Sequence, residues 1–295
     1  MKFLATLLIF LSTLGALSVD ISNSTIANGR TALFEFKKEK GVEYESLTFL
    51  KKKYKVYQHP LDSSKVYALL PVSYYAKVET KKVKVNYKKG SKRASETLFV
   101  KIVWGDYKKE EIHVQKSKVN PTKNKHKKRI AKEYKEAMRI YGTSTPKSYI
   151  KTAFILPLES FITSDFGKAR VYNGSLKGYH SGTDFRAKLG TPIIASNDGV
   201  VALVKKRFYS GGTVVIDHGQ GIYTCYFHMS EFAVKVGQHV AKGDVLGLSG
   251  QSGRVTGPHL HFAVRVGGTQ VDPLQFIKLM NDKLLLQNNT IKETK

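Results

Sequence analysis

The sequence predicts a mainly β protein in which two β-rich parts are joined by a basic helix, and three patterns support this fold class. The pattern is strand-like from about 28 to 115, where residues 82–87 alternate between polar and apolar with period two, as in a half-buried strand. Short apolar runs separated by glycines follow residue 151, where 18 of the 24 glycines lie. A lysine-rich stretch with helical spacing lies between them. We expect, in chain order, a signal peptide (1–18), an N-terminal β-rich domain (19–118), a basic helix and linker (119–150), an antiparallel β-sheet domain (151–280) and a tail (281–295).

The composition is globular but strongly basic. Hydrophobic residues make up 41% and charged residues 24% of the chain, which excludes a fully disordered, collagen-like or polytopic membrane protein. The formal net charge is +26, and residues 1–150, with 32 basic and 13 acidic residues, carry +19 of it. Such an excess favours a polyanionic partner or surface. Cys225 is the only cysteine, so neither an intramolecular disulfide nor a cysteine-based zinc cluster can form.

The first 18 residues have the features of a secretory signal. Lys2 precedes a largely apolar run over 3–17, and small residues stand at Ala16 and Ser18. The run is short for a membrane span, which needs about 20 apolar residues, and an uncleaved N-terminal anchor is the alternative. Export without disulfides favours a periplasmic or cell-wall location.

The N-terminal domain contains a predicted hairpin. Residues 82–87 alternate with period two, 88–92 form a polar turn, and 97–104 have the pattern of the returning strand. Residues 112–114 are expected to form a further short strand. The frequent tyrosines of this domain are expected to pack across strands rather than to form a binding face.

The basic stretch is predicted to be helical. Residues 116–135 carry nine basic side chains, and Ile130, Tyr134, Met138 and Tyr141 recur at helical spacing before a glycine. A nucleic-acid or anionic-polymer patch is one interpretation of these charges. We favour the solvated face of a helix, and export also argues against a nucleic-acid partner.

Glycine-separated β-runs dominate the second half of the chain. The clearest runs are 200–204, 213–216, 222–227 and 260–264. Their close spacing indicates an antiparallel sheet or a barrel-like core. Asp272 followed by Pro273 predicts the start of a terminal helix, because Asp caps helix N-termini and Pro suits the first turn.

Four of the nine histidines occur in patterns that suit metal chemistry. His180 and Asp184, four residues apart, point to the same side of an extended strand, and their nitrogen and oxygen donors suit zinc. His259 and His261 project from one face of a predicted strand, about 7 Å apart. His228 follows another predicted strand. Each pattern alone is weak, but together they indicate a functional site in the glycine-rich half.

Six short segments between about 155 and 275 form a set with a familiar order. They are Ile162-Thr163-Ser164-Asp165-Phe166-Gly167, the H-x-x-x-D from His180 to Asp184, 190–195, 215–219, 226–230 and Gly257-Pro258-His259-Leu260-His261-Phe262. Together they resemble the zinc metallopeptidase domain of the LytM/lysostaphin family. The resemblance covers a little under half of the chain, and the joint match is far more specific than any one segment.

The resemblance implies a ligand set. Carried over by position, it makes His180, Asp184 and His261 the ligands of a Zn²⁺ ion. Three protein ligands leave a fourth tetrahedral position for water, which is the mark of a catalytic zinc site. Such an ion lowers the pKa of that water toward about 7 and polarises the scissile carbonyl.

The resemblance also implies three catalytic side chains. His259 and His228 correspond to an unliganded catalytic pair, and we expect His259 to act as the base with the assistance of His228. Tyr209 lies where the family often has a tyrosine that stabilises the oxyanion, although this position falls in a variable loop.

Four other residues are assigned no catalytic role. His218 is expected to be structural, His239 to lie on the surface and Cys225 to be a packed thiol. Residues 236–247 also resemble the hairpin of lipoyl and biotinyl carrier domains, in which Lys242 would be the modified lysine. The export signal and the histidines argue against a carrier.

The function implied by the resemblance is a periplasmic zinc endopeptidase that acts on peptidoglycan. The expected bond is the D-alanine–meso-diaminopimelate cross-link, and removal of the terminal D-alanine from pentapeptide stems is an expected second activity. A non-catalytic cell-wall-binding activator of another hydrolase is the alternative. The basic N-terminal domain is expected to regulate the site by restraining it or to dock on the wall. Peripheral membrane association and the oligomeric state stay open.

Overall fold

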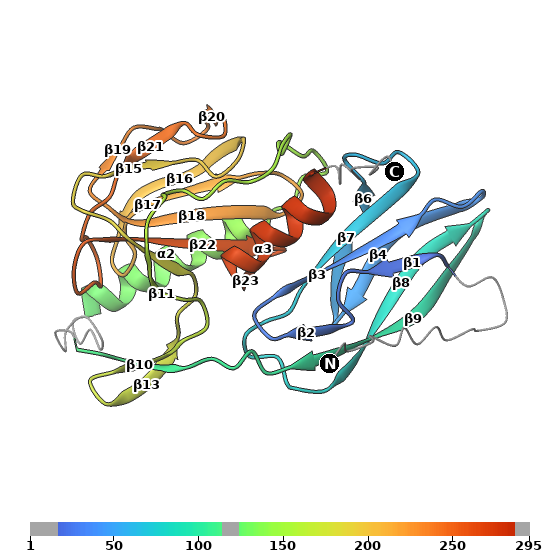
Figure 1. The fold of residues 1–295 in the computed structure, drawn as a ribbon, viewed down its shortest axis with the longest axis horizontal. Helices are drawn as coiled ribbons and strands as arrows, with labels where there is room; N and C mark the ends of the chain where they lie inside the picture. Colours follow the sequence, from blue (N-terminus) through green and yellow to red (C-terminus); the bar gives the residue numbers. More distant parts are fainter. Residues whose placement is uncertain (1–16, 114–123, 287–295) are drawn as a thin grey trace, which may run out of the picture.

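The computed structural model describes residues 17–113 and 124–286 and confirms the mainly β fold class. The chain forms two β-rich lobes that lie side by side (Figure 1). The expected signal peptide lies outside the described residues except for its last two positions. Leu17 is buried in the N-terminal lobe, and the Ser18 backbone N–H donates to Glu39 Oε1 at 3.1 Å.

The N-terminal lobe is a sandwich of two sheets. Phe34 and Leu70 from one sheet and Leu47, Val85 and Ile102 from the other belong to a single buried cluster, so the core lies between the sheets. The four-stranded sheet has the order β1 (Val19–Ile21), β3 (Thr31–Lys37), β7 (Lys65–Pro71), β6 (Tyr57–Gln58). The five-stranded sheet has the order β2 (Thr25–Ala27), β9 (Lys92–Val103), β8 (Thr80–Lys89), β4 (Val42–Phe49), β5 (Lys52–Lys55).

The predicted hairpin of this lobe is present as β8 and β9. The two strands are antiparallel, and Gly90 in the turn has a φ of 60°, which glycine adopts at little cost. Tyr44 and Tyr87 face each other across β4 and β8 with ring centroids 6.4 Å apart, as the expected cross-strand packing requires.

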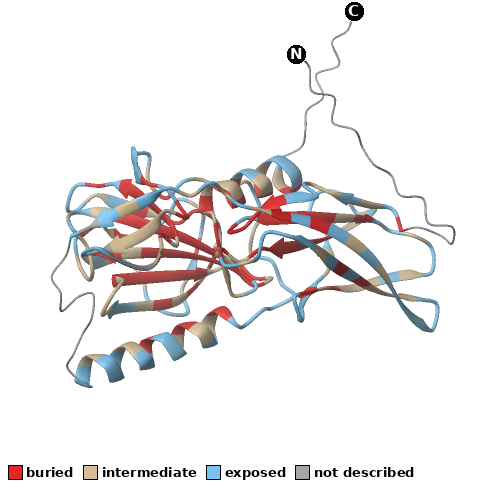
Figure 2. Ribbon diagram, turned by 90° about the horizontal axis from the view of Figure 1, so that it is seen from below, coloured by how far each residue is buried: buried red, intermediate tan, exposed pale blue. Residues whose placement is uncertain are grey.

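The C-terminal lobe is built on an eight-stranded antiparallel sheet. Its order is β11 (Ile162–Ser164), β14 (Thr183–Arg186), β22 (His259–Val266), β18 (Ile222–Met229), β17 (Gly211–Asp217), β16 (Gly199–Arg207), β20 (His239–Val240), with β23 (Thr269–Val271) paired to β22. A smaller sheet has the order β15 (Pro192–Ile194), β21 (Val245–Leu248), β19 (Glu231–Phe232). The central strands are buried along most of their length (Figure 2).

The terminal helix begins where the sequence predicts. In α3 (Pro273–Met280), Asp272 is the N-cap and accepts from the backbone N–H groups of Leu274 and Gln275. A five-residue π-helical turn, η1 (Asn281–Leu285), follows α3, and Leu284 within it is fully buried. The expectation of a tail from 281 is therefore wrong for 281–285, and residues 287–295 lie outside the described part.

The basic helix is α2 (Asn124–Tyr141), which packs on the outside of the large sheet, with an exposed outer surface (Figure 2). Ala137 and Tyr141 join a cluster with Val215, Tyr223 and other sheet residues. The solvated face is therefore as expected. Of the apolar residues at helical spacing, Tyr141 is buried and Met138 packs against the same cluster, but Tyr134 does not.

The buried face of α2 runs through Glu133 rather than through Tyr134, which is 63% exposed. Glu133 is buried because Arg129 donates to it at 2.7 Å and the Phe208 backbone N–H donates to it at 2.9 Å. A carboxylate can occupy this buried position because it is paired.

The two lobes share contacts across their junction. Leu33 and Leu69 of the N-terminal lobe belong to the main buried cluster of the C-terminal lobe. Thr31 and Gln275 exchange two hydrogen bonds, of 2.9 and 2.8 Å. Tyr74 stacks on Tyr179 with ring centroids 3.9 Å apart. These contacts fix the orientation of the lobes.

One strand crosses between the two halves of the chain. β10 (Lys109–Ile112) lies within the range expected for the N-terminal domain, but it pairs in parallel with β12 (Ala169–Tyr172) in a sheet completed by β13 (Ser175–Tyr179). The prediction of a short strand at 112–114 is wrong in its bounds, because the strand ends at 112 and residue 113 lies beyond it, while residue 114 lies outside the described residues. Figure 1 shows β10 and β13 together below the large sheet.

Candidate metal centre and catalytic cleft

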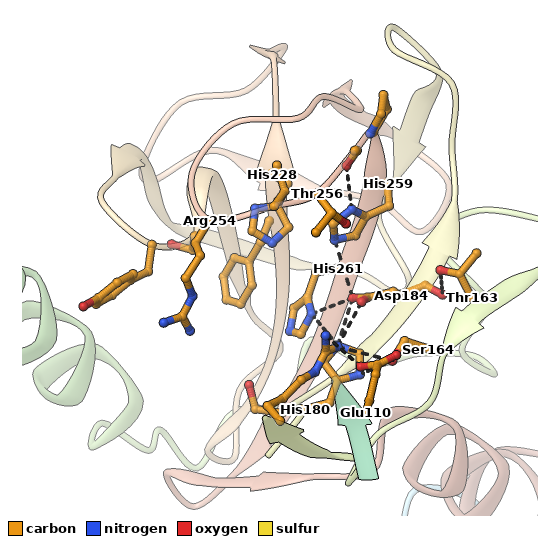
Figure 3. Close-up of a pocket in the computed structure, with 18 of the residues that line it drawn as sticks. Glu110, Thr163, Ser164, His180, Asp184, His228, Arg254, Thr256, His259 and His261 are labelled. Carbon is orange, nitrogen blue, oxygen red and sulfur yellow. Dashed lines mark hydrogen bonds and ion pairs between the residues drawn. The ribbon is translucent and has the colours of Figure 1, made fainter. Parts of the chain in front are cut away.

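Three buried side chains bring their donor atoms together at one edge of the large sheet. His180 Nε2 lies 2.9 Å from Asp184 Oδ1 and 2.9 Å from His261 Nδ1, and the last two atoms are 2.8 Å apart. Among the described residues, these three form a group of histidine and carboxylate donors that could hold a metal ion. Figure 3 shows the three side chains converging.

Strand register accounts for this convergence. Asp184 on β14 is the direct partner of His261 on β22, so both side chains leave the sheet at the same place. His180 precedes β14 and approaches from the turn between β13 and β14. Gly182 in that turn is required, because a Cβ atom there would lie 2.6 Å from His261 Nε2.

The tautomer of His180 suits metal binding. Its Nδ1 lies 2.7 Å from the carbonyl oxygen of Asp165, which can only accept a hydrogen bond, so Nδ1 carries the proton. Nε2 is then left with a lone pair that faces Asp184 and His261. A carbonyl partner on the far nitrogen is the usual support of a metal-binding histidine.

His228 and His259 stand beside this group with a similar arrangement. His228 Nδ1–H donates to the Ser252 carbonyl at 2.8 Å, and His259 Nδ1–H donates to the Gly257 carbonyl at 2.9 Å. Their rings are 4.8 Å apart, and His259 Nε2 lies 3.7 Å from Asp184 Oδ1. Both Nε2 atoms are therefore proton acceptors beside the candidate metal position.

The backbone at His228 is bent to place its ring. His228 has a φ of 65°, in the left-handed region that residues other than glycine seldom occupy. Its N–H donates to the Ser210 carbonyl at 2.9 Å, which holds this conformation at the end of β18. A strained residue at the rim of a cleft is a common feature of functional sites.

The protonation states suit a site that binds a cation and accepts protons. Burial, with smaller contributions from His261 and His259, lowers the pKa of His228 to about 3. Burial likewise lowers the pKa of His261 to about 4. Burial alone would raise the pKa of Asp184, but the interactions with the adjacent imidazoles of His180 and His261 outweigh it and hold that pKa well below its usual range. Neutral imidazoles and an ionised carboxylate are the forms that bind zinc.

A cleft of about 750 Å³ opens over these residues. Tyr209 and Arg254 line it together with the five histidine and aspartate side chains, and the Arg254 guanidinium lies 4.5 Å from the centre of the Tyr209 ring. The structure therefore brings all six predicted site residues to one cleft. Glu110 and His113, from before α2, line the same cleft.

An ion-pair network behind the donor group was not anticipated from the sequence. Arg170 Nη2 donates to Asp184 Oδ2 at 3.2 Å, and Arg170 Nη1 lies 2.8 Å from Glu110 Oε2. Ser164 Oγ donates to Glu110 Oε1 at 3.0 Å. Ser164 lies in the segment 162–167 that resembles the family, but nothing in the sequence relates Glu110 to Arg170, which lies 60 positions further on.

The residues assigned no catalytic role lie outside the cleft. His218 is fully buried, with Nδ1 2.7 Å from the Asp198 carbonyl and Nε2 2.8 Å from Thr224 Oγ1, and burial lowers its pKa to about 4. His239 is exposed beside the Tyr149 ring.

Cys225 and Lys242 also lie outside the cleft. Cys225 is buried against the Tyr141 hydroxyl, and burial raises the pKa of its thiol. Lys242 donates to Thr152 Oγ1 at 2.7 Å and to the Ala153 carbonyl at 3.1 Å. A tethered lysine of this kind does not suit the exposed swinging attachment point of a carrier domain.

The donor chemistry of the group fits zinc. The group offers two imidazole nitrogens and one carboxylate oxygen, which are typical zinc ligands. Catalytic zinc sites have three such protein ligands and keep a fourth position open for water. The buried donors have the protonation states that metal binding requires.

Comparison with known proteins gives consistent matches to this lobe. Residues 178–273 match peptidase family M23. The chain is 44% identical over 115 residues to peptidoglycan DD-endopeptidase ShyA of Vibrio cholerae, covering 39% of this chain and 27% of that protein. It is 42% identical over 95 residues to DD-carboxypeptidase/endopeptidase Mpg of Neisseria meningitidis, covering 32% of this chain and 22% of that protein.

A structural match extends over both lobes. A crystal structure from Pseudomonas aeruginosa, described as a peptidase M23, superposes with a TM-score of 0.66 at 27% identity, covering 85% of this chain and 94% of that one. By contrast, the sequence matches to ShyA and Mpg span only about a quarter of those proteins.

Proposed function

We propose that the chain, whose residues 178–273 match peptidase family M23, is a zinc-dependent peptidoglycan hydrolase that cleaves D-alanine–meso-diaminopimelate cross-links. The observation that carries the proposal is the juxtaposition of a His–Asp–His donor group and two further histidines, His228 and His259, in one cleft. His180, Asp184 and His261 are the proposed zinc ligands, and His259, His228 and Tyr209 are the proposed catalytic residues.

The geometry of the cleft supports the proposed role of each side chain. His180, Asp184 and His261 would hold the zinc ion, which when bound would activate a water and polarise the substrate carbonyl. His259 Nε2, which faces the donor group at 3.7 Å from Asp184 Oδ1, takes a proton from the attacking water and returns it to the leaving amine. His228 Nε2 lies on the same side and assists this transfer.

Two further residues that line the cleft, Tyr209 and Arg254, are proposed to balance charge in the transition state. Tyr209 is proposed to donate its hydroxyl to the oxyanion that develops on the substrate carbonyl. The Arg254 guanidinium over the Tyr209 ring adds positive charge at that end of the cleft. The substrate carboxylates of peptidoglycan stems suit this charge.

The bond specificity rests on the relatives. ShyA is named a peptidoglycan DD-endopeptidase and Mpg a DD-carboxypeptidase/endopeptidase. Both names describe bonds that follow a D-amino acid. We therefore propose removal of the terminal D-alanine from pentapeptide stems as a second activity of the same site.

The proposed location is the periplasm, where peptidoglycan is accessible. No helix among residues 17–113 and 124–286 is long and apolar enough to cross a membrane. The net charge of +26 favours attraction to an anionic wall or membrane surface, although charges beyond about 8 Å are screened at physiological salt. Nucleic acid is not a proposed partner.

The N-terminal lobe is proposed to dock on the wall. Its five-stranded sheet buries Val83 and Val85 on the inner face and exposes Lys82 and Lys84 on the outer face. Lys53 on β5 and Lys84 on β8 pair with the same residue of β4, so the basic residues gather on one exposed surface. Peripheral membrane association would use the same surface.

A non-catalytic activator is the alternative function. Such a protein would need neither an intact donor group nor two histidines beside it whose Nδ1 atoms are held by backbone carbonyls. The presence of both favours the enzyme.

Purified cross-linked muropeptides provide the test. We expect the zinc-loaded full chain to convert tetra–tetra and tetra–penta dimers to monomers, and a chelator to stop the conversion. Intact dimers together with cleavage of a pentaglycine peptide would contradict the bond assignment. Failure to cleave either substrate at full zinc occupancy would favour the activator.

A further inference from the structure

The candidate metal site receives a side chain from the other half of the chain. β10 pairs in parallel with β12, and in this register Glu110 is the partner of Arg170. The Glu110 carboxylate therefore lies against the Arg170 guanidinium, with Oε2 2.8 Å from Nη1. Figure 3 shows Glu110 beside Ser164, His180 and Asp184 at the lower end of the cleft.

Arg170 connects Glu110 to a proposed zinc ligand. Its Nη2 donates to Asp184 Oδ2 at 3.2 Å and to Ser164 Oγ at 3.2 Å. The other oxygen of Asp184, Oδ1, faces His180 and His261. The two oxygens of one carboxylate are thus divided between the guanidinium and the donor group.

Ser164 closes the network from the other side. Its Oγ lies 3.0 and 3.2 Å from the two carboxylate oxygens of Glu110, and 3.3 Å from His180 Nδ1. Both Glu110 oxygens are therefore occupied by Arg170 and Ser164. Glu110 is not part of the group of donors that could hold the metal, so it supports the ligands rather than joining them.

The ion pair between Arg170 and Asp184 is largely buried. The Arg170 side chain is 12% exposed and that of Asp184 is 10% exposed. A buried guanidinium requires paired acceptors, because an uncompensated buried charge is costly. Without the Glu110 carboxylate, Asp184 would be the sole anion paired with Arg170 among the described residues, and Arg170 would compete with the metal for it.

We propose that Glu110 is a positioning residue that holds Arg170 so that Asp184 presents Oδ1 to zinc. The metal site is then complete only when β10 is paired with β12, and the N-terminal half of the chain contributes directly to it. This inference rests on the proposed zinc site and extends it to residues outside the family match, which begins at 178.

The test is zinc affinity of the full chain, measured by competition with a chromogenic chelator. Glu110→Gln keeps the shape of the side chain but removes its charge. Loss of an outer support of a metal ligand typically costs 10–100-fold in affinity, so we expect zinc to bind at least about tenfold more weakly. Glu111→Gln, on the same strand and also beside the cleft, is the matched control and should stay within about threefold of the parent.

A double variant separates positioning from a general structural effect. If Glu110 acts through Arg170, the variant carrying both Glu110→Gln and Arg170→Gln should bind zinc no more weakly than Arg170→Gln alone. Additive losses would overturn the proposal, as would parental zinc affinity in Glu110→Gln.

Two further outcomes are assigned in advance. If Glu110→Gln does not fold, Glu110→Asp is measured instead, because it keeps the charge but shortens the reach. It should weaken zinc binding severalfold, and parental affinity would overturn the proposal. If the parent itself binds no zinc, the proposed function fails, and the failure is distinguishable from an error about Glu110 alone.

Discussion

Replacing His228 or His259 with alanine should separate catalysis from metal binding. Neither ring belongs to the three-residue donor group, so each variant should keep about one zinc per chain. Each ring has its Nδ1–H fixed on a backbone carbonyl, which leaves Nε2 as the proton acceptor. General acid–base catalysis contributes about 10²–10⁴-fold, equivalent to about 3–5 kcal/mol of transition-state stabilisation. We therefore expect kcat/KM to fall by that factor.

The assay combines metal analysis with the rate of cleavage of a cross-linked muropeptide dimer. His239→Ala, which removes an exposed histidine on β20, is the control and should retain parental zinc and rate. Loss of zinc together with activity in both cleft variants would mean that His228 and His259 are ligands. Activity within about threefold of the parent would remove them from the mechanism.

Three other predictions concern the metal, the stability and the docking surface. His261→Ala should lower zinc content sharply, because His261 Nδ1 is 2.8 Å from Asp184 Oδ1 at the centre of the donor group, and undiminished zinc would refute the ligand assignment. Burial lowers the pKa of His218 to about 4 in the fold, against 6.5 in the unfolded chain. Its contribution to the free energy of unfolding is therefore complete above pH 6.5 and is lost as the pH falls toward 4. The parent should therefore lose about 3 kcal/mol more unfolding free energy than His218→Gln over that interval in denaturant titrations, and parallel curves would contradict this. Lys53→Glu with Lys84→Glu should weaken co-sedimentation with peptidoglycan sacculi without changing cleavage of soluble dimers, and unchanged binding would exclude this docking surface.

Much of the cleft could be predicted because its chemistry is encoded locally. The period of two on a strand puts His259 and His261 on the same side of β22, and the short turn returns His180 toward Asp184. The pairing of β14 with β22 then joins the two motifs, which the sequence could supply only through family resemblance. The glycine at 182 is part of the same local pattern.

The supporting network could not be predicted, because it depends on a long-range pairing. Glu110 and Arg170 meet only because β10 and β12 are parallel neighbours, and no local pattern marks either residue. In the same way, Tyr134 shares its helical spacing with other apolar residues of α2 but is exposed, whereas Glu133 is buried and paired with Arg129. Polar residues that are buried because they are paired are invisible to a hydrophobic pattern.

The structure also moves the boundary of the C-terminal domain toward the N-terminus. The sequence places the start of the peptidase domain at 151, but Tyr141 of α2 packs against Tyr223 of the large sheet. The segment that follows α2 is also held against this lobe, since the Gln220 N–H donates to the Thr145 carbonyl at 3.0 Å. Residues before 151 thus cover and support the C-terminal lobe.

Anomalous diffraction at the zinc absorption edge tests the central claim most directly. For crystals of the full chain grown with zinc, we expect one strong peak within bonding distance of His180 Nε2, Asp184 Oδ1 and His261 Nδ1, about 2.0–2.2 Å from each. His228 and His259 should lie near the peak without binding it. A peak elsewhere, or a site in which either of these two histidines replaces one of the three proposed ligands, would contradict the account.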